Sequence, residues 1–256
     1  MKIIVAIKHV VSRDSVLEIR HDGRWIDEED LSFEMNEPDA YALEAALQLK
    51  EQHGGEVIAL CAGPADASKT IREALAKGAD RALHIEAESL EQAGSLSLGR
   101  LLAAAVEPEA PDLVLTGLQS DDLGSGQTGV VLAELLGLPH ASIIVEIERT
   151  ETGIRARREL EGGWFQRIEL PLPAVLTIQS GISKLRYATL MGIRQARGKE
   201  VRRLTAGDLG VSLDQPAALS RVYPPERTKQ TQILGGSPAE AAAQLVEKLK
   251  REARAI

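Results

Sequence analysis

The chain has 256 residues, a length that suits one large domain or one domain with appendages. Apolar residues make up 44% and charged residues 27% of it, so a large core can form and a disordered chain is excluded. Aromatic residues amount to 3% and the net charge is −8, which together argue against a binder of nucleic acid or anionic membranes.

The cysteine and histidine content bears on metal sites and on the compartment. Cys61 is the only cysteine, so an intrachain disulfide and a cysteine-based metal cluster are excluded, and a reducing compartment fits. The histidines show no metal-ligand spacing. The chain starts on an alternating apolar segment instead of a secretory signal, and no apolar stretch of about 18 residues follows. We expect a cytoplasmic protein that has no metal site and does not insert into a membrane.

The first part of the chain alternates short aliphatic runs with helical patterns. Strands are predicted at Lys2–Lys8, Glu56–Leu60, Arg81–Ile85 and Leu113–Thr116. Helices are predicted from Pro38 onward and at Ala65–Lys77, Ser95–Val106 and Gln127–Leu136. This alternation predicts an α/β fold with a doubly wound, mostly parallel sheet of the Rossmann-like type.

The pattern changes after Pro139. Strands are predicted at Ser142–Glu148, Ile154–Leu160 and Trp164–Leu170, joined by Thr-Gly and Glu-Gly-Gly turns, which makes residues 142–170 an antiparallel extension of the sheet. A buried strand follows at Ala174–Ile178, and Pro171 and Pro173 keep the stretch before it out of a sheet interior. Trp164 and Phe165 are neighbours and must point to opposite faces, so one is expected to be exposed or covered by another subunit.

The end of the chain is predicted to be an arm and a helix. Asp214–Gly236 has no periodicity, and Ser237, Pro238 and Glu240 form a capping box that starts a helix to about Ala255. We therefore expect a nucleotide-binding domain over 1–213 and an arm with a helix over 214–256. The arm either lies on another surface or packs back on its own domain.

The segment LVLTGLQSDDLGSGQTG, residues 113–129, is a predicted strand, a small polar loop and a helix start. Such a turn presents backbone N–H groups and a positive helix end, which favour phosphate. Residues 124–129 match the dinucleotide-binding motif G-x-G-x-x-G. In that motif the glycines follow the first strand, whereas here they follow the fourth. The alternative that the loop only caps a helix, with glycines for close packing, therefore remains. The carboxylates of Asp121 and Asp122 would repel a phosphate, so we expect them to face ribose hydroxyls, the adenine edge or solvent.

Two further segments are expected beside this loop. Asn36–Asp39 opens the first helix, and the first strand ends near Ala6. In a doubly wound sheet both border the crevice where the strand order reverses. The sequence therefore predicts a binding crevice with three walls.

Several of these residues together resemble a known family. Arg158–Thr177, RELEGGWFQRIELPLPAVLT, matches the signature of electron transfer flavoprotein beta subunits, and Lys184–Leu190, KLRYATL, contains the core of their partner-recognition loop. Asn36 with the acid after it, the loop at 117–129 and the ERT of residues 226–228 agree in order. The resemblance spans essentially the whole chain.

The resemblance implies an electron carrier and not an enzyme. Such a beta subunit pairs with an alpha subunit that holds most of a FAD, which accepts electrons from acyl-CoA and related dehydrogenases and passes them to a membrane quinone oxidoreductase. Ordinary members bury a structural AMP in the beta subunit, whereas the electron-bifurcating branch holds a second FAD there. Gln127-Thr128-Gly129 resembles the AMP type, and the Asp-Gly-Asp-Thr-Ala-Gln run of the bifurcating branch is missing.

The resemblance also implies site residues. For AMP they are Ala6, Asn36, Glu37, Pro38, Asp39, Ala62, Gly117, Gln119, Asp121, Asp122, Leu123, Gly124, Ser125, Gly126, Gln127 and Thr128. For docking to the dehydrogenase they lie in the recognition loop at 180–197, namely Arg186, Tyr187, Ala188, Thr189, Leu190 and Met191, with Leu190 as an exposed anchor.

Two positions keep a second interpretation, and two others depart from the family pattern. Leu190 is, from the residues alone, the first core contact of a short basic helix. Glu159 is implied to pair with an arginine of the alpha subunit near the flavin, whereas its own neighbours Arg157 and Arg158 indicate a solvated cross-strand ion pair. The chain departs from the family at Met191-Gly192, which replaces Pro-Asn, and near Ser12 and Arg13, where a flavin-contacting aromatic residue is not evident.

The rival interpretations are a standalone adenine-nucleotide-binding or hydrolysing α/β domain and an NAD-dependent dehydrogenase. The second would need an acid/base pair in the crevice, and none is found in the sequence.

Overall fold

A computed structural model describes all residues except 89, 91–92, 214–218 and 226–230. The chain divides into two compact units, Met1–Arg221 and Val222–Ile256. The predicted arm therefore falls partly outside the described residues, among them Asp214 and the segment ERT at 226–228.

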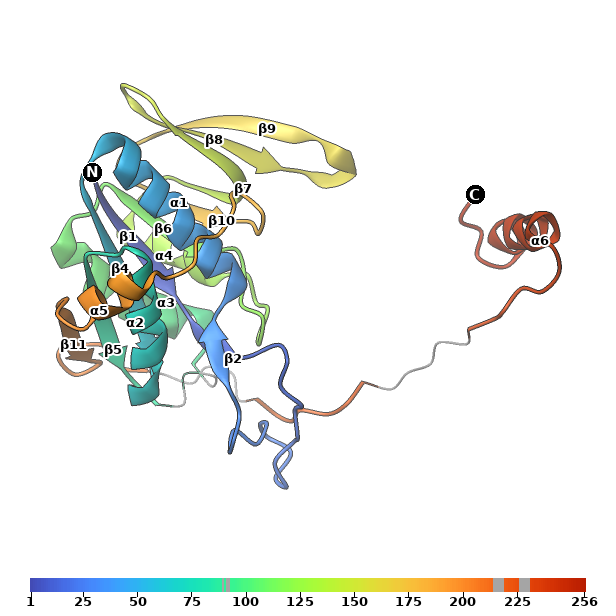
Figure 1. The fold of residues 1–256 in the computed structure, drawn as a ribbon, viewed down its shortest axis with the longest axis horizontal. Helices are drawn as coiled ribbons and strands as arrows, with labels where there is room; N and C mark the ends of the chain where they lie inside the picture. The colour runs from blue at the N-terminus through green and yellow to red at the C-terminus, as the bar shows by residue number, and fades with distance from the viewer. Residues whose placement is uncertain (89, 91–92, 214–218, 226–230) are drawn as a thin grey trace. The chain divides into compact units, whose positions relative to one another are not determined.

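The first unit is built on one large sheet, whose strands lie in this order: β11 (Val201–Thr205), β5 (Arg81–Glu86), β4 (Glu56–Gly63), β1 (Lys2–Ile7), β6 (Leu113–Gly117), β10 (Ala174–Ile178), β7 (His140–Arg149), β8 (Gly153–Glu159) and β9 (Phe165–Pro171). Every neighbouring pair from β11 to β7 is parallel. β8 runs antiparallel to both β7 and β9. The predicted mostly parallel sheet with an antiparallel extension is confirmed (Figure 1).

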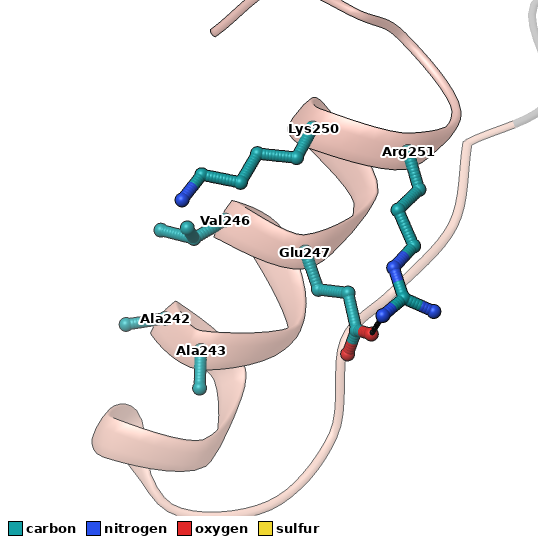
Figure 2. Close-up of a pocket in the computed structure, with 6 residues that line it drawn as sticks. All are labelled: Ala242, Ala243, Val246, Glu247, Lys250 and Arg251. Carbon is teal, nitrogen blue, oxygen red and sulfur yellow. Dashed lines mark ion pairs between the residues drawn. The ribbon is translucent and has the colours of Figure 1, made fainter.

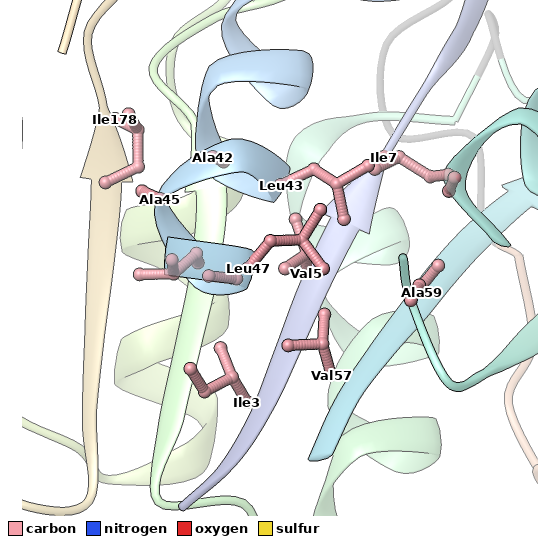
Figure 3. Close-up of a cluster of buried hydrophobic side chains, with 14 of the residues drawn as sticks. Ile3, Val5, Ile7, Ala42, Leu43, Ala45, Leu47, Val57, Ala59 and Ile178 are labelled. Carbon is pink, nitrogen blue, oxygen red and sulfur yellow. The ribbon is translucent and has the colours of Figure 1, made fainter. Parts of the chain in front are cut away.

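Helices cover both faces of the sheet. α1 (Glu37–His53), α2 (Ser68–Lys77) and α5 (Leu190–Ala196) supply buried side chains to the core on one face. α3 (Ser95–Val106) and α4 (Thr128–Leu136) supply those on the other. Figure 3 shows Ala42, Leu43 and Leu47 of α1 above Val5 and Val57 of the strands. Both cores are aliphatic, as the low aromatic content requires.

Three elements differ from the sequence prediction. A hairpin of β2 (His9–Val11) and β3 (Phe33–Met35) follows β1 almost without a break, so its first strand is hidden in the apolar run of β1. β11 was not expected, because Leu204 is its only buried residue. Gln127 is the residue before α4 and not its first turn.

The antiparallel extension carries the exposed aromatic pair. Trp164 precedes β9 and Phe165 begins it, and both side chains are exposed instead of one. The guanidinium of Arg157 lies 4.8 Å from the ring centroid of Phe165, a cation–π contact. Pro171 ends β9 at the sheet's edge, where its missing N–H costs no ladder bond.

The second unit contains α6 (Pro238–Arg251), which begins with the predicted capping box of Ser237 and Glu240 and ends earlier than Ala255. Figure 2 shows a hollow along this helix, lined by Ala242, Ala243, Val246, Glu247, Lys250 and Arg251. All of these residues come from one helix, and an ion pair of 3.3 Å joins Glu247 to Arg251. The hollow is therefore an open helix face and not an enclosed site.

The contact of α4 with the strands below it yields a stability prediction. A Cβ added at Gly129 would overlap the Thr116 hydroxyl and a Thr177 methyl group. Gly129→Ala should lower the free energy of unfolding by about 1–3 kcal/mol, because the packed helix start has to move. Gly198→Ala is the matched control, since its nearest neighbour would be 3.8 Å away. Denaturant unfolding measures both, and equal stabilities of the two variants would contradict this packing.

Candidate nucleotide-binding site

The candidate site lies where the strand order of the sheet reverses. β1 is followed by β4 and β5 on one side, whereas β6 lies on its other side. Doubly wound proteins bind ligands outside the carboxyl ends of the strands at this switch point. We call the residues gathered here, Ala6, Asn36–Asp39, Ala62 and 117–128, the switch-point site.

Asp39 joins the two central strands at this edge. Its carboxylate accepts a hydrogen bond from the N–H of Lys8 at 2.7 Å, just after β1, and another from the N–H of Gly117 at 2.9 Å, at the end of β6. Burial raises the pKa of Asp39 from 3.8 to about 7, although hydrogen bonds from Asn36, Lys8 and Gly117 act in the opposite direction. Gly117 has to be glycine here, because a Cβ would overlap the Asp39 carboxylate and Pro38.

Asn36 fixes the loop after β6. Its buried amide donates to the carbonyl of Gln119 at 3.0 Å, and its amide oxygen accepts from the N–H of Asp121 at 2.9 Å. One side chain thus satisfies both polar groups of the loop backbone that face it. The structure brings together the loop and the start of α1, as the sequence predicts.

The loop then turns into α4. Gly124 and Gly126 have φ of 61° and 64°, left-handed conformations that glycine adopts without strain. In the described structure no side chain caps the N terminus of α4. The first N–H groups of this helix and its positive end are therefore available to an anion.

Ala6 and Ala62 are small residues near the ends of β1 and β4. Ala62 packs with the core on the face of α3 and α4, and Ala6 points the same way because it lies two residues from Ile4. Both are only partly buried, unlike their strand neighbours. At these two strand ends the face of the sheet that α3 and α4 cover thus carries no bulky side chain.

Two basic side chains form ion pairs at the switch-point site. The ammonium of Lys8 lies 2.7 Å from the carboxylate of Asp122, and Arg13 binds Asp121 at 2.9 Å and Glu37 at 2.6 Å. Burial would raise the pKa of Asp122, but the Lys8 pair and hydrogen bonds lower it. Asp121 and Asp122, which we expected to face ribose, adenine or solvent, are thus paired with cations of this chain. Sequence reasoning missed Lys8 and Arg13 as site residues, although Lys8 directly follows β1 and Arg13 comes two residues after β2.

The residues expected to recognise a partner lie in α5 and in the segment before it, outside the switch-point site. Tyr187 is 91% and Leu190 84% exposed, and Met191 is exposed as well. The alternative that Leu190 is the first core contact of its helix is therefore wrong. Thr189 caps α5, with its hydroxyl accepting from the N–H of Gly192 at 3.0 Å.

Glu159 ends β8 opposite Phe165 and is partly buried. The proposed cross-strand pair with its neighbours is wrong, because Arg157 pairs with Glu146 and Arg158 donates to the carbonyl of Ser142. Among the residues described, none forms an ion pair with the Glu159 carboxylate.

Cys61 and His9, the remaining candidate groups, pack against other parts of the chain. Cys61 is buried, and burial raises the pKa of its thiol to about 12, so it is not a nucleophile at neutral pH. The ring of His9 stacks on Phe33 and bonds to Thr70. In the described part of the chain no cluster of His, Cys, Asp or Glu could hold a metal ion, and no helix is long and apolar enough to span a membrane.

Comparison with known proteins agrees with the fold. The architecture is that of doubly wound α/β proteins with a ligand-binding edge at the switch point. A family model described as an electron transfer flavoprotein domain matches residues 24–209. The chain is 38% identical to the electron transfer flavoprotein subunit beta of Methylophilus methylotrophus over 257 residues, which is 96% of this chain and 97% of that protein.

Other relatives carry the same description. The subunit beta of Bacillus subtilis is 36% identical over 93% of this chain and 91% of its own length. That of Bos taurus is 35% identical over 99% of this chain and 98% of its own length. The chain belongs to the family of electron transfer flavoprotein beta subunits.

The raised pKa of Asp39 predicts a pH dependence of stability. The folded chain holds this proton more tightly than the unfolded chain, so the stabilisation is present below about pH 4 and is lost as the pH rises to about 7. The slope is at most about 1.4 kcal/mol per pH unit. In Asp39→Asn this slope should vanish, and stability should fall by about 1–3 kcal/mol because one N–H loses its acceptor. Denaturant unfolding across this pH range measures both, and an unchanged slope would show that Asp39 is already ionised.

Proposed function

We propose that this chain is the AMP-holding, partner-recognising subunit of a heterodimeric electron carrier. Its proposed partner is an electron transfer flavoprotein alpha subunit that holds most of a FAD. In this proposal the flavin takes electrons from acyl-CoA and related dehydrogenases and passes them to a membrane quinone oxidoreductase. The observation that carries the proposal is the full-length similarity to beta subunits, together with a switch-point site of matching residues.

AMP suits the switch-point site on physical grounds. The uncapped N terminus of α4 offers N–H groups to the phosphate, and Gly124 and Gly126 allow close approach of the backbone. Ala6 and Ala62 leave room for a flat base, and Asn36 holds the loop in position. Gln127-Thr128-Gly129 supports AMP over a second FAD.

The alpha subunit is proposed to cover the exposed apolar groups of this chain. Trp164 and Phe165 are exposed at the tip of the β8–β9 hairpin, and Leu245 and Val246 are half-exposed on α6. Exposed apolar side chains of this kind, which each of the two units carries, are typical of surfaces that another protein covers. Glu159, at the same hairpin, is proposed to face the flavin-bearing part of the alpha subunit.

The nucleotide content tests the first part of this proposal. The heterodimer, purified and denatured, should release one FAD and one AMP, as measured by mass spectrometry and flavin absorbance. Asn36→Ala should lose AMP, because the loop after β6 loses both of its hydrogen bonds to this side chain. Gln52→Ala, an exposed change on the same helix, should keep it. Two FAD per heterodimer would place the protein in the electron-bifurcating branch, and ATP turnover by the isolated chain would favour a nucleotide hydrolase.

Leu190 tests the docking role. Leu190→Ala should leave the melting temperature and bound cofactors nearly unchanged, because the side chain is 84% exposed. Electron acceptance from the partner dehydrogenase should weaken about thirtyfold in affinity, the loss of ~2 kcal/mol typical for an interface anchor. Leu96→Ala, also at an exposed leucine in the first turn of a helix, is the control. Unaltered docking of Leu190→Ala would show that the recognition-loop assignment is wrong.

A further inference from the structure

Arg186 lies inside the proposed recognition segment and is bound to α1 through two carboxylates. Its Nε donates to Glu44 at 2.7 Å and its Nη2 to the other oxygen of Glu44 at 3.0 Å. The backbone N–H of Arg186 also points to Glu44, at 3.3 Å. Nη1 and Nη2 donate to Glu51 at 2.6 and 3.2 Å. In Figure 1 the orange segment between β10 and α5 passes across α1, where these contacts form.

The burial and charge of this cluster make it more than a surface ion pair. The Glu44 side chain is 5% exposed, and it also accepts from Gln48 at 2.8 Å. Burial would raise the pKa of Glu44, but the bonds from Arg186 hold it below its ordinary value. Hydrogen bonds from Arg186 likewise lower the pKa of Glu51. The cluster carries one positive and two negative charges, so Arg186 does not present a free cation to a partner.

The exposed apolar side chains follow directly on this cluster. Tyr187 is the next residue and Leu190 begins α5. The far end of α5 and the residues after it are bound to α2, with Arg72 donating to the carbonyl of Ala196 at 2.6 Å and Lys199 to that of Leu75 at 2.9 Å. The segment that carries Tyr187 and Leu190 is thus held on both sides, by α2 after it and by α1 before it.

We propose that Arg186 is a positioning residue, which holds Tyr187 and Leu190 in the docking conformation through Glu44 and Glu51 and does not itself contact the dehydrogenase. The inference rests on the proposed docking function. It adds that Arg186, Glu44 and Glu51 act on docking through Tyr187 and Leu190. A rigid, preorganised segment loses less conformational entropy on binding. The guanidinium binds both oxygens of Glu44 and both oxygens of Glu51. The single ammonium of a lysine keeps the charge and does not reproduce this set of paired bonds.

The test uses the purified heterodimer and one dehydrogenase as electron donor. Arg186→Lys should raise the concentration of heterodimer needed for half-maximal reduction about tenfold without changing the limiting rate. Glu51→Gln, at an exposed carboxylate of α1, should act in the same direction, about threefold. Hydrogen exchange of residues 182–189 should speed up in both variants, and melting temperatures should change little. Flavin and nucleotide contents should stay the same.

Arg81→Lys is the matched control. Arg81 also bridges two carboxylates, Glu56 and Glu109, and its side chain is 21% exposed against 29% for Arg186. Glu109 follows α3, so this bridge belongs to the opposite face of the sheet. Docking and exchange of residues 182–189 should not change in this variant.

The outcomes separate this inference from the docking function itself. If Leu190→Ala weakens docking while Glu51→Gln leaves docking and exchange unchanged or tightens docking, Arg186 contacts the dehydrogenase directly and the positioning role is wrong. If Leu190→Ala also has no effect, the docking function fails. A parallel loss of melting temperature and of cofactor in Arg186→Lys and Glu51→Gln would show that the cluster only stabilises the fold.

Discussion

The position of one buried carboxylate determines how the central part of this molecule is arranged. Asp39 accepts hydrogen bonds from the N–H just after β1 and from the N–H at the end of β6. The order of the sheet reverses between these two strands. Because Asp39 belongs to the first turn of α1, these bonds fix the start of that helix against both strands. Asn36 is held there too, and through it the loop that leads into α4.

α1 links the two regions to which we assign function. Its first turn lies at the switch-point site, whereas Glu44 in its middle and Glu51 in its last turn bind Arg186. The remaining side of the helix is apolar and covers the central strands, as Figure 3 shows. One helix therefore contacts both the loop proposed to bind a nucleotide and the segment proposed to dock, which are far apart in the sequence.

The sequence predicts well those features that depend on local patterns. α3 and β10 have the predicted bounds, because long apolar runs between turn residues determine them. β11 escapes notice because it is an edge strand in which only Leu204 is buried, and β2 escapes because it continues the apolar run of β1. The pairing of Arg186 with Glu44 is beyond sequence reasoning, since the two residues are 142 positions apart and no local pattern links them. The pairing of Asp122 with Lys8 has the same cause, since 114 residues separate them.

The central claim is that the switch-point site holds an adenine nucleotide between the start of α1 and the start of α4. A crystal structure of the heterodimer, purified without added nucleotide, tests this most directly. The account predicts AMP at this edge, with its phosphate on the N–H groups at the start of α4 and its base beside Asn36 and the loop after β6. A flavin ring at this edge, or AMP bound elsewhere in the heterodimer, would contradict it.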